Sequence, residues 1–185
     1  LTGEPKKGVG PHDVALALVA ATFENGFLKN KVMEFTGPGL ANLPVEFRNG
    51  IDVMTTETTC LSSIWETDEA VRRYYGIHGR PQDYAELKPA AVAYYDSMIA
   101  LDLSKVESMI ALPFHPSKAY TIHEFNARAK ELLAEVEQEA KKQFPKAKTD
   151  LLSKVQPDGS VLADQGIIAG CAGGTYDNIV EAAAI

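Results

Sequence analysis

The clearest periodic pattern in the chain lies between residues 121 and 144. One face of this run carries the apolar residues Phe125, Ala129, Leu132, Leu133, Val136 and Ala140, and the opposite face is charged. Thr121 and Glu124 precede the run with the spacing of a capping box, and Pro145 follows it. The pattern predicts an amphipathic helix that begins at Thr121 and ends before Pro145.

Residues 14–23 (VALALVAATF) show a different pattern, because they are apolar on nearly every side. A helix of this composition is buried on more than one face, and Asp13 is placed to cap it. Shorter helices are predicted with Pro44 as a first helical residue, over residues 68–75, and over residues 176–185.

Short apolar runs between these helices read as strands. They are residues 32–35, 61–65, 167–169 and at least one strand within 94–103. Helices therefore alternate with strands, and the connections are mostly short. This order predicts an α/β fold in which mostly parallel sheet layers carry helices on both faces. Ligands of such sheets bind at the carboxyl ends of the strands.

The composition and net charge of the chain indicate which classes of binding partner are expected. The chain has 185 residues, a net charge of −7 and 45% hydrophobic residues. An acidic chain lacks the basic face that nucleic acid requires, so we expect no nucleic-acid partner. No apolar run approaches a membrane span, so we expect no membrane partner either. The opening residues lack a signal-peptide pattern and the two cysteines lie far apart, which favours a cytoplasmic protein.

Cys171 is the first candidate for chemistry. It follows the predicted strand at 167–169 and lies among Gly170, Gly173 and Gly174, just before the predicted helix that Thr175 can cap. Strand, glycine-rich turn and helix together expose a side chain at a sheet edge, and a helix N-terminus favours the thiolate. Cys171 is therefore a candidate metal ligand or nucleophile. The alternative is a small buried cysteine in a tight turn.

Glu57 is the second candidate. It lies in the run Thr55–Cys60, between a predicted helix and a predicted strand, and its threonine neighbours can hydrogen-bond a carboxylate or a ligand. A partly buried carboxylate there can act as an acid or base. The alternative is a solvated loop glutamate or a helix cap. Cys60 itself reads as a core residue.

The four histidines show no metal-binding pattern. No two of them are separated by three or four residues, as the ligands of a helical metal site would be. We expect surface or capping roles for all four: His12, His78, His115 and His123.

Three stretches of the chain resemble the aconitase family of iron–sulfur hydro-lyases. Residues 32–65 resemble the family segment in which a strand, a Gly-Pro-Gly turn and a helix lead to a Met-x-x-Glu motif, here Met54 and Glu57. Residues 95–114 resemble the family's connection with Tyr-Asp, Leu-Ser and Pro-Phe pairs. The surroundings of Cys171 are similar to the family's Gly-Ser-Cys-Thr-Asn sequence.

The resemblance implies a cofactor and a reaction. Cys171 would be the first of three cysteine ligands of a [4Fe–4S] cluster whose fourth iron is open to substrate. Glu57 would belong to the acid–base network at the substrate. The reaction would eliminate and add water on a small hydroxy-polycarboxylic acid, with the open iron acting as a Lewis acid. The fold would be aconitase-domain-like.

The resemblance also implies a domain division. Residues 1–120 would form an α/β domain similar to the second aconitase domain. Residues 121–185 would hold an inserted amphipathic helix and the start of the next α/β domain. We expect the chain to be a fragment whose partners are the remaining domains of the same polypeptide. Alone, it is predicted to be inactive and to hold no cluster, because one thiolate cannot bind it.

Departures from the family pattern leave two other hypotheses open. The Cys-x-x-Cys motif that would supply two more thiolates is absent, and Gly173 and Gly174 stand where Asn-Ser is usual. The parent protein could instead be a diverged, non-catalytic ligand-binding or interaction module. Alternatively, Cys171 could be a nucleophile at a helix terminus.

Overall fold

Helices dominate the computed structural model, which describes residues 1–185. The helices and strands are, in chain order, α1 (Pro11–Thr22), β1 (Val32–Phe35), α2 (Val45–Asp52), β2 (Ser62–Trp65), α3 (Glu69–Ile77), β3 (Met109–Ala111), β4 (Ala119–Thr121), α4 (Ile122–Gln143), α5 (Gly170–Gly173) and α6 (Tyr176–Ala183). Short 3-10 helices include η1 (Pro38–Asn42), η2 (Thr55–Thr58) and η5 (Leu152–Lys154). No helix combines the length and the apolar composition needed to cross a membrane.

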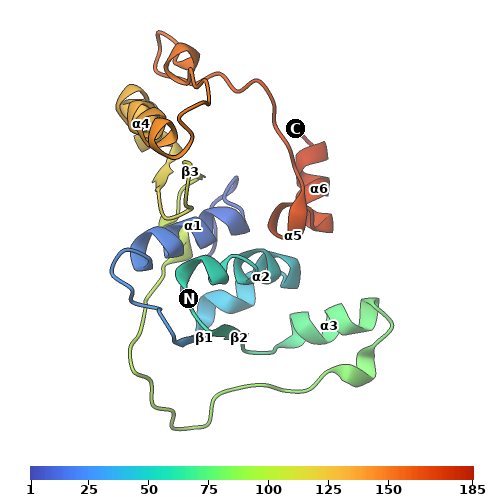
Figure 1. The fold of residues 1–185 in the computed structure, drawn as a ribbon. Coiled ribbons are helices and arrows are strands. Elements are labelled where there is room, and N and C mark those ends of the chain that lie inside the picture. Colours follow the sequence, from blue (N-terminus) through green and yellow to red (C-terminus); the bar gives the residue numbers. More distant parts are fainter.

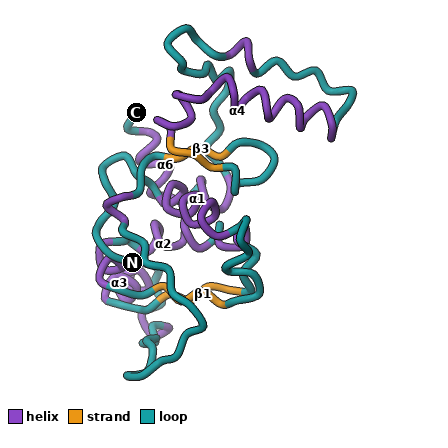
Figure 2. The backbone as a smooth tube through the Cα atoms, turned by 90° about the vertical axis from the view of Figure 1, so that its left-hand side faces the viewer, coloured by secondary structure: helices purple, strands orange, loops and turns teal.

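Helix α1 occupies the centre of the molecule. Figures 1 and 2 show it between the β1–β2 pair on one side and the β3–β4 hairpin on the other. Its buried residues lie on several faces: Pro11, Val14, Ala15, Leu16, Leu18, Val19 and Thr22. The prediction that this helix is buried on more than one side is confirmed. It begins at Pro11, and the Asp13 carboxylate accepts a hydrogen bond from the Gly10 amide at 2.7 Å.

Each sheet has two strands. β1 pairs with β2 in parallel, from Val32 opposite Ser62 to Phe35 opposite Trp65, and β3 pairs with β4 in antiparallel fashion. Met33 and Phe35 point into a core that also contains residues of α1 and α2. The opposite side of the β1–β2 pair is crossed by the extended segment 84–101 (Figure 1), whose Tyr95 hydroxyl donates to Glu34.

The mixture of helices and strands agrees with the predicted class, but the sheets differ from the prediction. One pair is parallel and one is antiparallel, and helices cover one face of β1–β2 rather than both. The predicted strand within residues 94–103 does not form, and its sole ladder contact is a bridge between Thr2 and Asp102. A mixture of aromatic and aliphatic residues there predicted a strand, but most of the segment is exposed to solvent.

Helix α4 matches its prediction closely. Thr121 is its N-cap and accepts a hydrogen bond from the Glu124 amide at 3.0 Å, and the helix ends before Pro145. All six apolar residues predicted to share one face are buried. Most of them form a second hydrophobic cluster with Leu112, against which Ile110, Tyr120, Leu151, Val155 and Val161 pack. The helix is kinked at Arg128, where φ is −121°.

The predicted strand at residues 167–169 is wrong. These residues are coil, and the side chains of Ile167 and Ile168 are 76% and 55% exposed. A strand needs a neighbour to satisfy its backbone groups, and this chain offers none at that place. Two helix starts also differ by one residue from prediction, since Pro44 is the N-cap of α2 and Asp68 is the N-cap of α3.

Candidate functional site

Glu57 projects from the tight turn η2, between α2 and β2. The neighbouring Thr55 and Thr58 are buried, and their hydroxyls donate to the backbone oxygens of Asp52 and Thr55 at 2.8 and 2.6 Å. The hydroxyls of these two threonines therefore hold the turn, and neither of them bonds the Glu57 carboxylate. The Glu57 side chain is 44% exposed, which leaves it open to a ligand.

His115 is the nearest ionisable partner of Glu57. Its Nε2 lies 3.9 Å from Oε2 of Glu57, and its ring stacks on Phe23 with centroids 4.0 Å apart. Phe23 closes the C-terminal end of α1. No local sequence pattern predicts this pair, because His115 comes from the loop between β3 and β4 and the pairing depends on how that hairpin packs against α1.

Cys171 lies in α5, a single helical turn entered through Gly170 with φ of +82°. Its thiol is exposed, so the alternative of a buried cysteine is wrong. The turn packs on the start of α1 and on α2: a side chain at Gly173 would meet His12, and Ala172 lies near Gly50.

The N-terminus of α6 is capped by a residue from another helix. Thr175 occupies the N-cap position without a side-chain hydrogen bond, whereas the Asp177 amide donates to the Glu46 carboxylate of α2 at 2.9 Å. Burial raises the pKa of Asp177, and the charges of Glu46 and Glu181 raise it further. The predicted capping role of Thr175 is therefore taken by Glu46, which attaches α6 to α2.

Glu57 and Cys171 lie at opposite ends of α1. Glu57 is near Phe23 through His115, and the turn that carries Cys171 lies against His12. At 1.5 Å per residue, the helix separates these two ends by about 16 Å. The chain does not bring the two candidates into contact, and no group of three potential metal ligands is present. Cys60 packs against the first core, as predicted, and its Sγ donates to the Thr55 oxygen at 3.4 Å.

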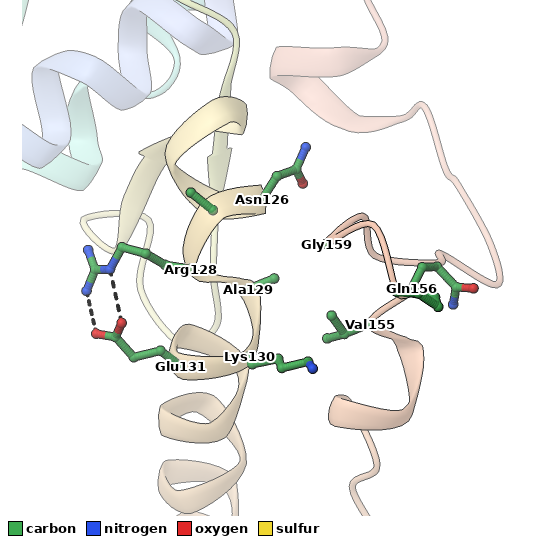
Figure 3. A pocket seen from close by; sticks show the side chains of 10 residues that line it. Asn126, Arg128, Ala129, Lys130, Glu131, Val155, Gln156 and Gly159 are labelled. Carbon is green, nitrogen blue, oxygen red and sulfur yellow. Dashed lines mark hydrogen bonds and ion pairs between the residues drawn. The ribbon is translucent and has the colours of Figure 1, made fainter.

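Two cavities lie elsewhere. One of about 640 Å³ separates β1 from residues 94–101 and is mostly apolar. The other, of about 300 Å³, lies between the kink of α4 and the turn at 155–159 (Figure 3). Figure 3 shows Arg128 and Glu131 paired with each other on one side of α4 and Lys130 extending toward Val155. Neither cavity is lined by Glu57 or Cys171.

Comparison with known proteins identifies the class. The family model described as aconitase family (aconitate hydratase) matches residues 1–185, which is the whole chain. The chain therefore belongs to the aconitase family, and the resemblance noted from its sequence is confirmed.

Several curated relatives match about two thirds of the chain. A 3-isopropylmalate dehydratase large subunit from Lachnoclostridium phytofermentans is 33% identical over 124 residues, covering 67% of this chain and 29% of the relative. A 2,3-dimethylmalate dehydratase large subunit from Eubacterium barkeri is 33% identical over 122 residues, covering 66% and 29%. A mitochondrial homoaconitase from Debaryomyces hansenii is 28% identical over 141 residues, covering 68% and 20%. The chain thus spans less than a third of these relatives.

Proposed function

We propose that this chain is part of an aconitase-family hydro-lyase that removes water from, and adds it to, a small hydroxy-carboxylic acid. The observation that carries the proposal is the family match over residues 1–185. The names of the relatives point the same way, since they include dehydratases of isopropylmalate and dimethylmalate. Because those relatives are much longer, the activity belongs to a polypeptide that contains this chain together with further domains.

In this proposal Glu57 supplies acid–base chemistry at the substrate. Its turn is fixed by two buried threonines, whereas its carboxylate is half-exposed and bonded to neither of them. A carboxylate held on a rigid turn but open to solvent can exchange a proton with a bound molecule.

Cys171 is proposed to contribute one thiolate to a [4Fe–4S] cluster. Its thiol is exposed and available to a ligand, whereas Cys60 lies against the core. These two cysteines do not form a donor set for a cluster, which needs several thiolates around one site. The remaining thiolates would come from other parts of the polypeptide.

The cluster assignment can be tested in the polypeptide that contains this chain. The purified protein is reconstituted with iron and sulfide, and the visible absorption of the cluster is recorded with dehydration of 3-isopropylmalate and of citrate. Cys171→Ser should abolish the absorption and the activity, whereas Cys60→Ser is the matched control and should keep both. Full absorption in the Cys171→Ser protein would contradict the assignment.

Two further outcomes would favour other functions. No cluster uptake by the unaltered protein would favour the non-catalytic ligand-binding or interaction module. Rapid alkylation of Cys171 in a protein that takes up no cluster would favour the nucleophile. Dehydration by the 185-residue chain alone would contradict the prediction that it is inactive by itself.

A further inference from the structure

The imidazole of His115 is held in one orientation by its own loop. The Ser117 amide donates a hydrogen bond to Nδ1 at 3.1 Å, and the Ser117 hydroxyl lies at the same distance from that nitrogen. An amide N–H can only donate, so Nδ1 accepts and the neutral ring carries its proton on Nε2. It is this Nε2–H that faces the Glu57 carboxylate.

Three elements fix the geometry of the pair. The His115 ring stacks on Phe23 at the end of α1, with an angle of 30° between the planes. The loop is closed by hydrogen bonds from the Lys118 amide to the His115 oxygen at 3.0 Å and from the Leu112 amide to the Lys118 oxygen at 2.8 Å. On the other side, the buried Thr58 anchors the turn that carries Glu57. Both partners are nevertheless partly exposed, at 37% for His115 and 44% for Glu57.

We propose that His115 is a positioning residue for Glu57, one that orients the carboxylate through its Nε2–H. The inference rests on the proposed function, because it assigns a partner to the proposed acid–base group. The separation of 3.9 Å is longer than a hydrogen bond. Hydrogen bonds of catalytic groups often shorten when substrate binds, so His115 acts on the carboxylate most strongly in the substrate complex.

The proposal predicts a split between kcat and KM in the polypeptide that contains this chain. His115→Leu removes the hydrogen-bond donor. As for other residues that orient a reacting group, its loss should lower kcat about tenfold or more. KM should change little. His115→Gln places an amide N–H near the position of Nε2 and should recover much of the loss. His123→Leu, at the exposed start of α4, is the matched control and should leave kcat unchanged.

Glu57→Gln, measured in parallel, separates the two proposals. If Glu57→Gln inactivates the enzyme and His115→Leu does not, the role of His115 is wrong and the proposed function stands. If Glu57→Gln leaves the activity intact, the role of Glu57 fails and that of His115 fails with it. If both positions act together, the Glu57→Gln/His115→Leu double variant should be no slower than Glu57→Gln alone.

A second measurement needs no variant and no activity. Imidazole ¹⁵N NMR of the unaltered protein should show His115 protonated at Nε2 and unprotonated at Nδ1 when the ring is neutral. A proton on Nδ1 would turn the N–H away from Glu57 and overturn the inference.

Discussion

Arg48 is the most heavily bonded buried side chain of the molecule. It is 3% exposed, its Nε donates to the Leu43 oxygen at 3.0 Å, and its Nη2 donates to the Leu40 oxygen at 3.1 Å. Both terminal nitrogens reach the two oxygens of Asp68, at 3.1 and 2.6 Å. Asp68 also accepts the Val71 amide at the start of α3. One guanidinium therefore joins α2, η1 and α3.

Acid should weaken this junction. Burial by itself would raise the pKa of Asp68, but the hydrogen bonds from Arg48 and from the Val71 amide outweigh it, so the pKa lies below its usual value. A carboxyl with a lowered pKa stabilises the fold above its unfolded pKa, near 4, and this contribution is lost as pH falls below that value. The free energy of unfolding should therefore decrease with acidification in this range.

Asp68→Asn tests the residue directly. Asparagine can still cap α3, but Arg48 loses its countercharge in a buried site. Removing one partner of a fully buried ion pair costs about 3–5 kcal/mol of folding stability. The cost of Asp68→Asn should be smaller, because the Asp68 side chain is 29% exposed. Urea unfolding at pH 7 and pH 3 measures the free energy of unfolding, and the difference in this energy between variant and parent should be smaller at pH 3.

Asp83→Asn is the control. Its partner Arg80 is largely exposed, so this substitution should lower the free energy of unfolding by less than about 1 kcal/mol. Equal losses in the two variants would contradict the proposed role of Arg48.

At the scale of elements, α4 holds the segment that follows it through a buried carboxylate. Oε1 of Glu137 accepts hydrogen bonds from the amides of Leu151 and Leu152 at 2.5 and 3.2 Å. Glu137 is buried on the same side as Val136 and Leu133. A charged side chain on the apolar side of an amphipathic helix is stable there because both amides satisfy it.

Glu137→Ala should release this segment. The two amides lose their acceptor, which costs about 1–3 kcal/mol for a buried unsatisfied group. Hydrogen exchange should become faster at Leu151 and Leu152, while Glu137→Gln, which keeps the Oε1 acceptor, should show a smaller change. Glu135→Ala on the exposed side of the same helix is the control. Slow exchange at both amides in Glu137→Ala would show that other contacts hold the segment.

Local sequence signals predicted the elements whose cause is local. The bounds of α4 follow from a capping threonine, a helical repeat and a following proline, all of which act within a few residues. The strand predictions at 94–103 and 167–169 were wrong because a strand depends on a partner strand that can be distant in the sequence, and no local pattern specifies that partner. Apolar composition alone could not distinguish an unpaired segment from a buried strand.

The residues of the candidate site also differ in whether local sequence signals could predict them. Glu57 could be selected from the sequence because a run of small polar residues marks a tight turn. Cys171 could be selected because the glycines that flank it mark a second tight turn, and the structure confirms that Cys171 is exposed. His115 could not be selected from the sequence, because its contact with Glu57 depends on how the β3–β4 hairpin packs against the C-terminal end of α1.

At the scale of the whole molecule, two hydrophobic clusters share one scaffold. The first is built around α1, β1 and α2, and the second around α4 with the β3–β4 hairpin. The hairpin packs on α1 as well as on α4, so it connects the clusters (Figure 2). Asp13 strengthens this connection with a single carboxylate, which accepts the Gly10 amide through Oδ2 and the Met109 amide of β3 through Oδ1, at 2.7 and 2.6 Å.

Asp13→Ala should uncouple the two clusters. The substitution removes the capping acceptor of α1 and the anchor of β3 together, with an expected cost of about 2 kcal/mol. Because the lost contact joins two clusters, the amides of β3 and β4 should exchange with solvent through a local opening that leaves β1 protected. Asp96→Ala, in the exposed segment 84–101, is the control. If β1 and β3 lose protection in parallel in Asp13→Ala, the two clusters unfold as one unit and the hairpin is more than a connection between them.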